Sequence, residues 1–383
     1  MGYTTVTGGQ EAIEQSHQLV DLYRLSNAKS PLQVAEIQSQ LQGLVDKVIS
    51  ESGFYAPSYA TLAIKQGQGD PAEAVFLLCA YRSTLPRNYY SNTVYTSDMR
   101  VIRRISSSFK DIPGGQMLGP TYDYTHRLLR FDLMNEDDNQ LKWILDQVRS
   151  EVTDNGETPT FRKVSDLLRE QGLIAPVQSP EVEREPFDVT RQKVQFPTTR
   201  QARLQLLARG ETGAMTAFAY SSMRGFGTVH PTIAELRVGY LAVSIPYPYA
   251  VDDEDSIYIG EVLVTEVESI NSFKMSDQQG EVQFSLGYGL CFGQNEVKAI
   301  SMSILERSLE TPGTGPTHDE EFILLHINSL ESNGFVSHLK LPHYTTFQAS
   351  LDRIRSVKDR FEKTLEDEKG DVDGIEQTEV PIR

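Results

Sequence analysis

Apolar residues in the first third of the chain recur every three or four positions, which is the spacing of one face of a helix. The clearest series, which begins behind Pro31, consists of Val34, Ile37, Leu41, Leu44, Val45 and Val48. Gly53 follows this series directly, and glycine commonly ends a helix. The pattern therefore predicts an amphipathic helix between Pro31 and Gly53.

A second apolar series starts behind Asp70 and Pro71 and extends through Leu85. Aspartate is a good N-cap, and proline fits the first helical turn, so a second helix is expected here. Two amphipathic helices need an apolar partner. We expect that partner to be the segment around Trp143 or a further helix from Phe161 to Gln171.

A proline-rich stretch divides the chain. Between 174 and 199 lie four prolines and mixed charges without periodicity, which is typical of a connection on the surface. We therefore predict a mainly helical N-terminal domain, 1–173, and a sheet-containing domain with C-terminal helices, 200–365. The tail, 366–383, is acidic and poor in aromatic residues, which favours disorder.

The apolar period changes to two in the second half, which indicates a strand. The strictly alternating residues are Val282, Phe284, Leu286, Tyr288, Leu290 and Phe292. Two more strands are expected at 235–245, with a bulge near Gly239, and at 257–264. Three late helices are expected at 295–309, 319–330 and 346–365. The fold class is therefore α+β, with a helical N-terminal region followed by a mixed sheet with flanking helices.

The net charge and the cysteine content argue against several classes of function. The 383 residues carry 53 acidic and 36 basic side chains, a net charge of -17, which disfavours binding to nucleic acid or an anionic membrane. Cys79 and Cys291 lie in apolar stretches, where buried free thiols are expected rather than an iron–sulfur or other cysteine metal site. No basic region followed by an apolar one, and no membrane-length apolar run, is present, so we expect a cytoplasmic protein.

The second face of the strand 282–292 consists of small residues. Its members are Ser285, Gly287, Gly289, Cys291 and Gly293. Glycines weaken a strand, so a row of them indicates that a ligand or another backbone comes close. Gly293 also precedes a helix N-terminus, where backbone N–H groups can hold a phosphate. Tight packing of a helix on the sheet explains the same row equally well.

Two loops carry groups suited to a charged substrate. In the first, Arg224, Gly225, Gly227 and His230 could bind a phosphate and donate a proton, although a turn with a backbone-bonded histidine explains them too.

In the second loop, Asp123, His126 and Arg127 would face one pocket if the chain were helical there. An ordinary surface ion pair between Asp123 and Arg127 is the alternative.

His338 and His343 lie five residues apart with Pro342 between them, which keeps His343 out of a helix. Histidine is the commonest metal ligand, but a zinc site needs three or four ligands. The acidic run 319–321 could supply oxygen ligands, but it fits better as the cap and first turn of the next helix.

Several blocks of the chain resemble the I subunit family of carbon–phosphorus lyase. They are 8–13, 73–82, 110–129, 224–231, 287–293 and 334–344. The resemblance extends to about Phe347 and is weak from 135 to 199 and from 365 onward.

This resemblance implies a component of α-D-ribose 1-methylphosphonate 5-triphosphate synthase, which displaces adenine from ATP with an alkylphosphonate. It further implies cleavage of purine nucleoside triphosphates by the chain alone, and the G, H, J, K and L subunits as partners. His338 and His343 would bind zinc at the boundary with the J subunit. A non-catalytic scaffold that carries zinc and docks the other subunits is the alternative.

Departure of adenine leaves positive charge on the ribose, so the reaction needs a carboxylate near the sugar, an acid near the base and cations on the phosphates. The candidates for these three roles in turn are Asp123 or Glu261, His126 or His230, and Arg224 or Arg127 with Mg2+. We expect these groups and the glycines to converge on one cavity.

Overall fold

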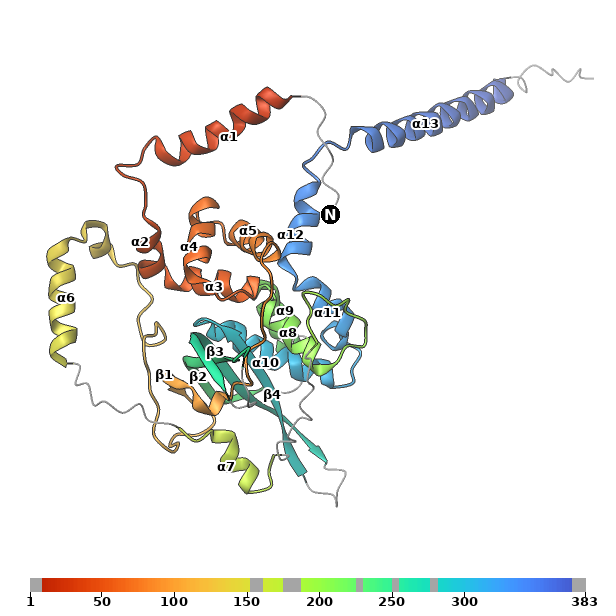
Figure 1. The fold of residues 1–383 in the computed structure, drawn as a ribbon. Coiled ribbons are helices and arrows are strands. Elements are labelled where there is room, and N and C mark those ends of the chain that lie inside the picture. The colour runs from red at the N-terminus through yellow and green to blue at the C-terminus, as the bar shows by residue number, and fades with distance from the viewer. Residues whose placement is uncertain are drawn as a thin grey trace, which may run out of the picture. The chain divides into compact units, whose positions relative to one another are not determined.

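The computed structural model describes residues 9–151, 161–174, 187–224, 230–249, 255–275 and 282–373. Contacts divide the chain into a main unit, Val20–Ser332, and a terminal unit that joins Met1–Leu19 to Asn333–Arg383. Helices and an antiparallel sheet occupy separate stretches of the main unit (Figure 1), so the predicted α+β class is confirmed.

Four antiparallel strands pair in sequence order and form the sheet of the main unit. They are β1 (Arg100–Ile105), β2 (Thr232–Pro246), β3 (Ser256–Met275) and β4 (Val282–Phe292). The three strands expected in the second half are confirmed, although the sheet is antiparallel throughout and not mixed. β1 was not predicted, because its three arginines obscure the alternation.

A register shift lies beside Gly239, as expected, but the extra residue is on β1, because Val101 pairs with Gly239 and Arg103 pairs with Val238. The register between β2 and β3 shifts at Ile233/Glu235 and again at Val243/Ser244. At Gly239 a Cβ atom would lie 2.4 Å from the carbonyl oxygen of Arg100. Glycine is needed there because β1 runs so close to β2.

Helix α10 (Glu296–Glu310) covers the small-residue face of β4. A Cβ at Gly287 would lie 2.0 Å from the carbonyl oxygen of Ser303, and one at Gly289 would lie 2.1 Å from that of Ala299. The close approach predicted for this face is therefore made by the helix backbone, which was the packing alternative. No room remains above these two glycines for a phosphate.

The N-terminal helices pack on one another. They are α2 (Val34–Gln40), α3 (Gln42–Ser52), α4 (Pro57–Gln66) and α5 (Pro71–Ser83). Gly53 ends α3 in the left-handed conformation, and the Asp70 side chain caps α5, both as expected. The single helix predicted before Gly53 is broken at Leu41. Trp143, on α6 (Asp138–Glu151), is 61% exposed, so the expected packing against it is wrong.

A second core lies between α10 and three helices of the later sequence. These are α8 (Arg200–Arg209), α9 (Thr212–Arg224) and α11 (Glu320–His326). Asp319 caps α11 by accepting from the backbone N–H of Phe322, as its acidic run indicated. The predicted helix from Phe161 exists as α7 (Val164–Glu170) and contacts β2. α8 and α9 were not predicted.

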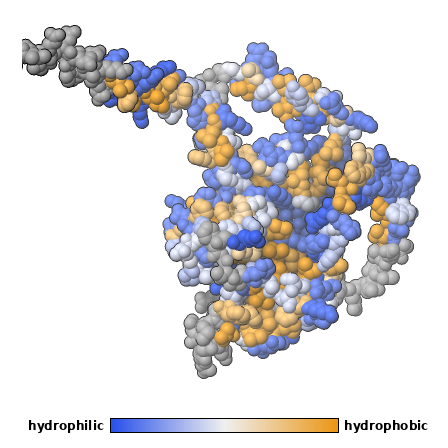
Figure 2. All heavy atoms as spheres, turned by 180° about the vertical axis from the view of Figure 1, so that it is seen from behind, coloured by the Kyte–Doolittle hydropathy of each residue, from blue (hydrophilic) through white to orange (hydrophobic). Residues whose placement is uncertain are grey.

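The terminal unit is helical. α1 (Gln10–Leu25) begins in this unit, α12 (Ser329–His338) ends in it, and α13 (Tyr344–Asp373) lies wholly within it. The tail expected to be disordered continues α13 as far as Asp373, and its remainder lies outside the described residues. Figure 2 shows apolar side chains between charged ones on α13. None of the helices described is both long and apolar enough to cross a membrane.

We expect Gly289→Ala to lower the free energy of unfolding by roughly 1–3 kcal/mol, because the added methyl group must push α10 off β4. Urea denaturation followed by circular dichroism measures this. Gly43→Ala is the matched control, since nothing lies within 4 Å of its Cβ position on α3. Equal losses for the two variants would contradict this packing.

Candidate functional site

A buried ion pair lies on the face of the sheet opposite α10. Arg237 on β2 and Glu266 on β3 stand directly across from each other, with side chains 2% and 3% exposed. The Nε atom of Arg237 donates to Oε2 of Glu266 at 3.1 Å, and its Nη2 atom donates to the same oxygen. Such a pair is stable in the interior only when further hydrogen bonds complete it.

The other carboxylate oxygen of Glu266 collects those further bonds. It accepts from Nζ of Lys163 at 2.8 Å, from Oγ1 of Thr96 at 2.7 Å and from the hydroxyl of Tyr288 at 3.1 Å. Burial raises the pKa of Glu266, but the attraction of Arg237 and Lys163 outweighs it and lowers the pKa to about 2. Glu266 is therefore a fixed anion that holds four other segments of the chain against β3.

A second buried pair anchors the neighbouring loops. Nε of Arg104 on β1 donates to Glu235 on β2, and Glu235 in turn accepts from the backbone N–H of Val164 at 3.0 Å. Arg104 also donates to the carbonyl oxygens of Pro113 and Arg162. These bonds tie the loop before residue 120 and the start of α7 to the sheet.

A polar cleft of about 800 Å³ opens beside this network, within the size range of pockets that hold small ligands. Its cations are Arg162, Lys163, Arg169 and Arg200, and its carboxylates are Asp98, Asp166 and Glu268. Tyr95, Phe161 and Tyr288 add aromatic surface. Cations suit phosphate groups, and carboxylates suit Mg2+.

Glu268 differs from the other carboxylates of the cleft. Burial raises its pKa, and the opposing attraction of Lys163, whose Nζ lies 3.6 Å away, does not cancel that effect. Its Oε2 atom has no hydrogen-bond partner among the described residues. A carboxyl group in this state holds its proton more readily than usual and can act as a general acid.

Three predicted site residues lie away from this cleft. Asp123, His126 and Arg127 are exposed in a non-helical loop. Asp123 pairs with buried Arg103, and one of its oxygens lies 3.6 Å from Nη2 of Arg127. The surface ion pair that was the alternative for Asp123 and Arg127 is therefore present.

The remaining charged candidates are also dispersed. Glu261 on β3 pairs with Arg100 at 2.6 Å. Arg224 is exposed at the end of α9, and His230 is exposed just before β2. Gly225 and Gly227 lie outside the described residues.

The three predicted glycines, two on β4 and Gly293 just after it, lie close to other parts of the chain. α10 covers both Gly287 and Gly289, and Gly287 also lines the cleft. Gly293 has φ +72° and a Cβ position 2.6 Å from the side chain of Asp46. The Asp46 carboxylate accepts from the backbone N–H of Gln294 at 3.0 Å, so the chain's own anion occupies the turn where a phosphate was expected.

The predicted residues therefore do not converge on one cavity in the described structure. The residues that do converge, Lys163, Arg169, Arg200 and Glu268, were missed. One signal could have found them: charged residues alternate with apolar ones in the middle of β2 and β3, where Glu235, Arg237, Glu266 and Glu268 are buried. Buried charges within a strand mark a paired network.

His338 and His343 lie close together within the terminal unit. Their ring centroids are 5.1 Å apart. Nδ1 of His338 faces the carbonyl oxygen of Phe335, and Nδ1 of His343 lies 2.6 Å from that of Leu341. A carbonyl at Nδ1 keeps the proton there and leaves Nε2 to bind a metal. Among the described residues no third ligand joins them, so a metal ion held by this pair would need further ligands from elsewhere.

Residues 2–361 match the family described as "Bacterial phosphonate metabolism protein (PhnI)". The chain is 48% identical to a "Putative C-P lyase subunit protein HtxH" of Stutzerimonas stutzeri, over 94% of this chain and 97% of that protein.

Two further relatives are called "Alpha-D-ribose 1-methylphosphonate 5-triphosphate synthase subunit PhnI". The one from Escherichia coli (strain K12) is 43% identical, over 93% of this chain and 98% of the relative. The one from Rhizobium meliloti (strain 1021) is 41% identical, over 93% and 95%.

We expect Glu266→Gln to lower the free energy of unfolding at pH 7 by roughly 3–5 kcal/mol, because it leaves two buried cations without their anion. The pKa of Glu266 falls from 4.5 to about 2 on folding, so its stabilisation is complete above pH 4.5 and is lost as the pH falls toward 2. Denaturation curves of both proteins between pH 7 and pH 2 should therefore converge at low pH.

Glu261→Gln is the control for this variant, since its pair with Arg100 is partly exposed and contributes less than about 1 kcal/mol. A constant difference between Glu266→Gln and the original chain down to pH 2 would show that the charge of Glu266 is not what stabilises the sheet.

Proposed function

The chain belongs to the PhnI family of bacterial phosphonate metabolism proteins, and from this premise we propose that the polar cleft beside Glu266 binds the nucleoside triphosphate. The chain is a subunit of the ribose 1-methylphosphonate 5-triphosphate synthase type, an enzyme of the carbon–phosphorus lyase complex, and works within a multi-subunit assembly.

One observation carries the proposal: four cations and three carboxylates line a single cleft of about 800 Å³. Arg162 pairs with Glu170 and is 46% exposed, and Arg169 pairs with Asp166 at 2.6 Å and is 20% exposed. In this proposal both arginines exchange these partners for the polyphosphate. Asp166 can hold the Mg2+ that accompanies ATP. Cations and carboxylates together thus match a magnesium–triphosphate group.

In the proposed reaction an oxygen of the alkylphosphonate forms a bond to C1′ of the ribose, and the C1′–N9 bond to adenine breaks. Adenine leaves with the electron pair and needs a proton. Glu268, whose pKa is raised, supplies that proton, and a carboxylate such as Asp98 stabilises the positive charge on the ribose. With water in place of the phosphonate, the chain alone releases free purine.

The earlier candidates Asp123, His126, His230, Glu261, Arg127 and Arg224 lie outside this cleft, and their catalytic roles stay predictions. A partner subunit that covers the exposed loop 121–127 would contact Asp123, His126 and Arg127. The partners in this proposal are the G, H, J, K and L subunits, and the location is the cytoplasm, where ATP is available. The net charge of -17 argues against nucleic acid as a ligand.

His338 and His343 are proposed to hold zinc through Nε2 at the boundary with the J subunit. The carbonyl oxygens at both Nδ1 atoms support this, because they select the tautomer that a metal requires. Zinc bound there would supply a Lewis acid and a link between subunits. The partner subunit or water completes the ligand set.

A docking role is the second candidate, and one observation favours it. Phe347, Ile354 and Phe361 on α13 are 62%, 66% and 67% exposed at helical spacing, which is a face suited to another subunit. Release of purine by the purified chain separates the two functions, since a scaffold releases none above background.

We expect the chain to release adenine from ATP, and we expect Arg162→Gln and Arg169→Gln each to raise KM for ATP by about tenfold or more, since each removes a charge-assisted hydrogen bond to a phosphate. Chromatographic assay of free adenine measures this. Arg149→Gln, which changes an exposed arginine on α6, is the matched control. An unchanged KM for ATP in both variants would show that the cleft does not bind the substrate.

We expect His338→Ala and His343→Ala each to lower the zinc content of the assembled complex by more than half, because two ligands from one chain act together. Plasma mass spectrometry of the purified complex measures it. His326→Ala, an exposed histidine outside the pair, should retain full zinc. Full zinc content in both pair variants would place the metal elsewhere.

A further inference from the structure

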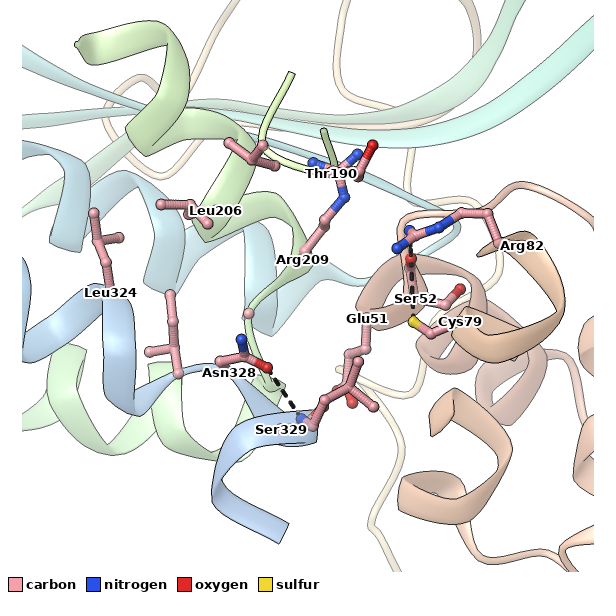
Figure 3. Close-up of a pocket in the computed structure, with 14 residues that line it drawn as sticks. Glu51, Ser52, Cys79, Arg82, Thr190, Leu206, Arg209, Leu324, Asn328 and Ser329 are labelled. Atoms are coloured by element: carbon pink, nitrogen blue, oxygen red, sulfur yellow. Dashed lines mark hydrogen bonds between the residues drawn. The ribbon is translucent and has the colours of Figure 1, made fainter. Parts of the chain in front are cut away.

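A second, smaller cavity lies away from the nucleotide cleft. Its volume is about 160 Å³, well above the roughly 10–15 Å³ that one water molecule requires. α3, α5, α8 and α11 contribute its walls (Figure 3). Arg82 and Arg209 reach toward the same space from α5 and α8, and Leu206 and Leu324 lie on the side away from Arg82.

Arg209 forms no ion pair with any residue that the structure describes. Its Nε atom is buried without a hydrogen bond, and no carboxylate of the described residues lies within ion-pair distance of its guanidinium group. Burial lowers the pKa of Arg209, and the charge of Arg82 lowers it further, although the charge of Asp188 opposes both effects. Two cations side by side in a partly buried pocket are unfavourable unless an anion joins them.

The acids nearest to this cavity are already engaged. Glu51 accepts from the backbone N–H and the hydroxyl of Thr212. Asp188 accepts from Arg87 and from both the hydroxyl and the backbone N–H of Thr190. Asp188 attracts Arg209 only from beyond ion-pair distance, and Glu51 forms no ion pair with it. Within the described residues, therefore, no anion joins Arg209 to Arg82, and we infer that a ligand supplies it.

The backbone makes room for Arg209. Gly53 has φ +60°, and a Cβ there would lie 2.3 Å from Nε of Arg209. The glycine that ends α3 therefore also allows the arginine side chain to lie against it. Arg82 is held by its bond to the carbonyl oxygen of Ser52, and its other guanidinium N–H groups form no hydrogen bond with the residues that the structure describes.

We propose that this cavity is a second binding site, for a small tetrahedral phosphorus oxyanion, either an alkylphosphonate or inorganic phosphate. Two guanidinium forks match the oxygens of such a dianion. The side-chain amide N–H groups of Asn328 add donors, because its Oδ1 atom is occupied by two backbone N–H groups. The apolar end at Leu206, Leu324 and Ile327 fits an alkyl group and distinguishes a phosphonate from phosphate.

Isothermal titration calorimetry of the full chain, with methylphosphonate or inorganic phosphate and without nucleotide, tests this site. We expect Arg209→Gln to weaken binding of the anion by about ten- to a hundredfold, in line with the loss of charge-assisted hydrogen bonds. Arg149→Gln should bind as the original chain does. Tighter binding of methylphosphonate than of phosphate would identify the alkylphosphonate, and the reverse order would identify phosphate.

Arg82→Gln supplies a second measurement, and circular dichroism confirms that each variant is folded. Equal affinity of the original chain, Arg209→Gln and Arg82→Gln would overturn the proposal, as would the absence of binding to the original chain. Arg162→Gln separates the two sites, since it should weaken ATP binding and leave anion binding unchanged. A failure of the nucleotide cleft would therefore not be mistaken for a failure of this cavity.

Discussion

The buried anion of Glu266 is the interaction on which the rest of the main unit depends. Transfer of a carboxylate and an arginine from water to the protein interior costs several kcal/mol per ion. The hydrogen bonds and ion pairs that the two groups form in the interior must offset roughly that cost. Glu266 offsets this cost by accepting hydrogen bonds from β2, β4, the segment before β1 and the residue before α7. The network thus fixes, beside the sheet, the segments that line the cleft.

This arrangement explains why the candidate site lies where it does. Lys163 bonds to Glu266 and also reaches toward Glu268, so one cation both completes the core and enters the cleft wall. Glu266 keeps a low pKa, and Glu268, two residues along β3, has a raised pKa. Two carboxyl groups whose environments separate their pKa values are the usual basis of an acid/base division in an active site.

Local signals made much of the fold predictable. Gly53, Asp70 and Pro71 mark helix ends through their own backbone preferences, and the period of two in 282–292 defines β4 without reference to distant residues. β1 escaped prediction because its arginines are neutralised by partners far along the chain, such as Glu235 for Arg104.

The site was less predictable for the same physical reason. Charge pairs between β2 and β3 depend on strand register, and the cleft joins 162–169 to Arg200 and Glu268, which no local pattern connects. The glycine row of β4 illustrates the opposite case. The sequence indicated that another group approaches Gly287 and Gly289. A bound ligand and a packed helix both require such a row of glycines, and in the structure α10 is the group that approaches them.

Photolabelling with 8-azido-ATP, followed by peptide mass spectrometry, tests the central claim most directly. If the cleft beside Glu266 holds the nucleotide, the label should appear in peptides that contain residues 95–98 or 161–169, and excess ATP should remove it. Labelling confined to the loop 121–127 or to 224–230, with the cleft peptides unmodified, would contradict the account.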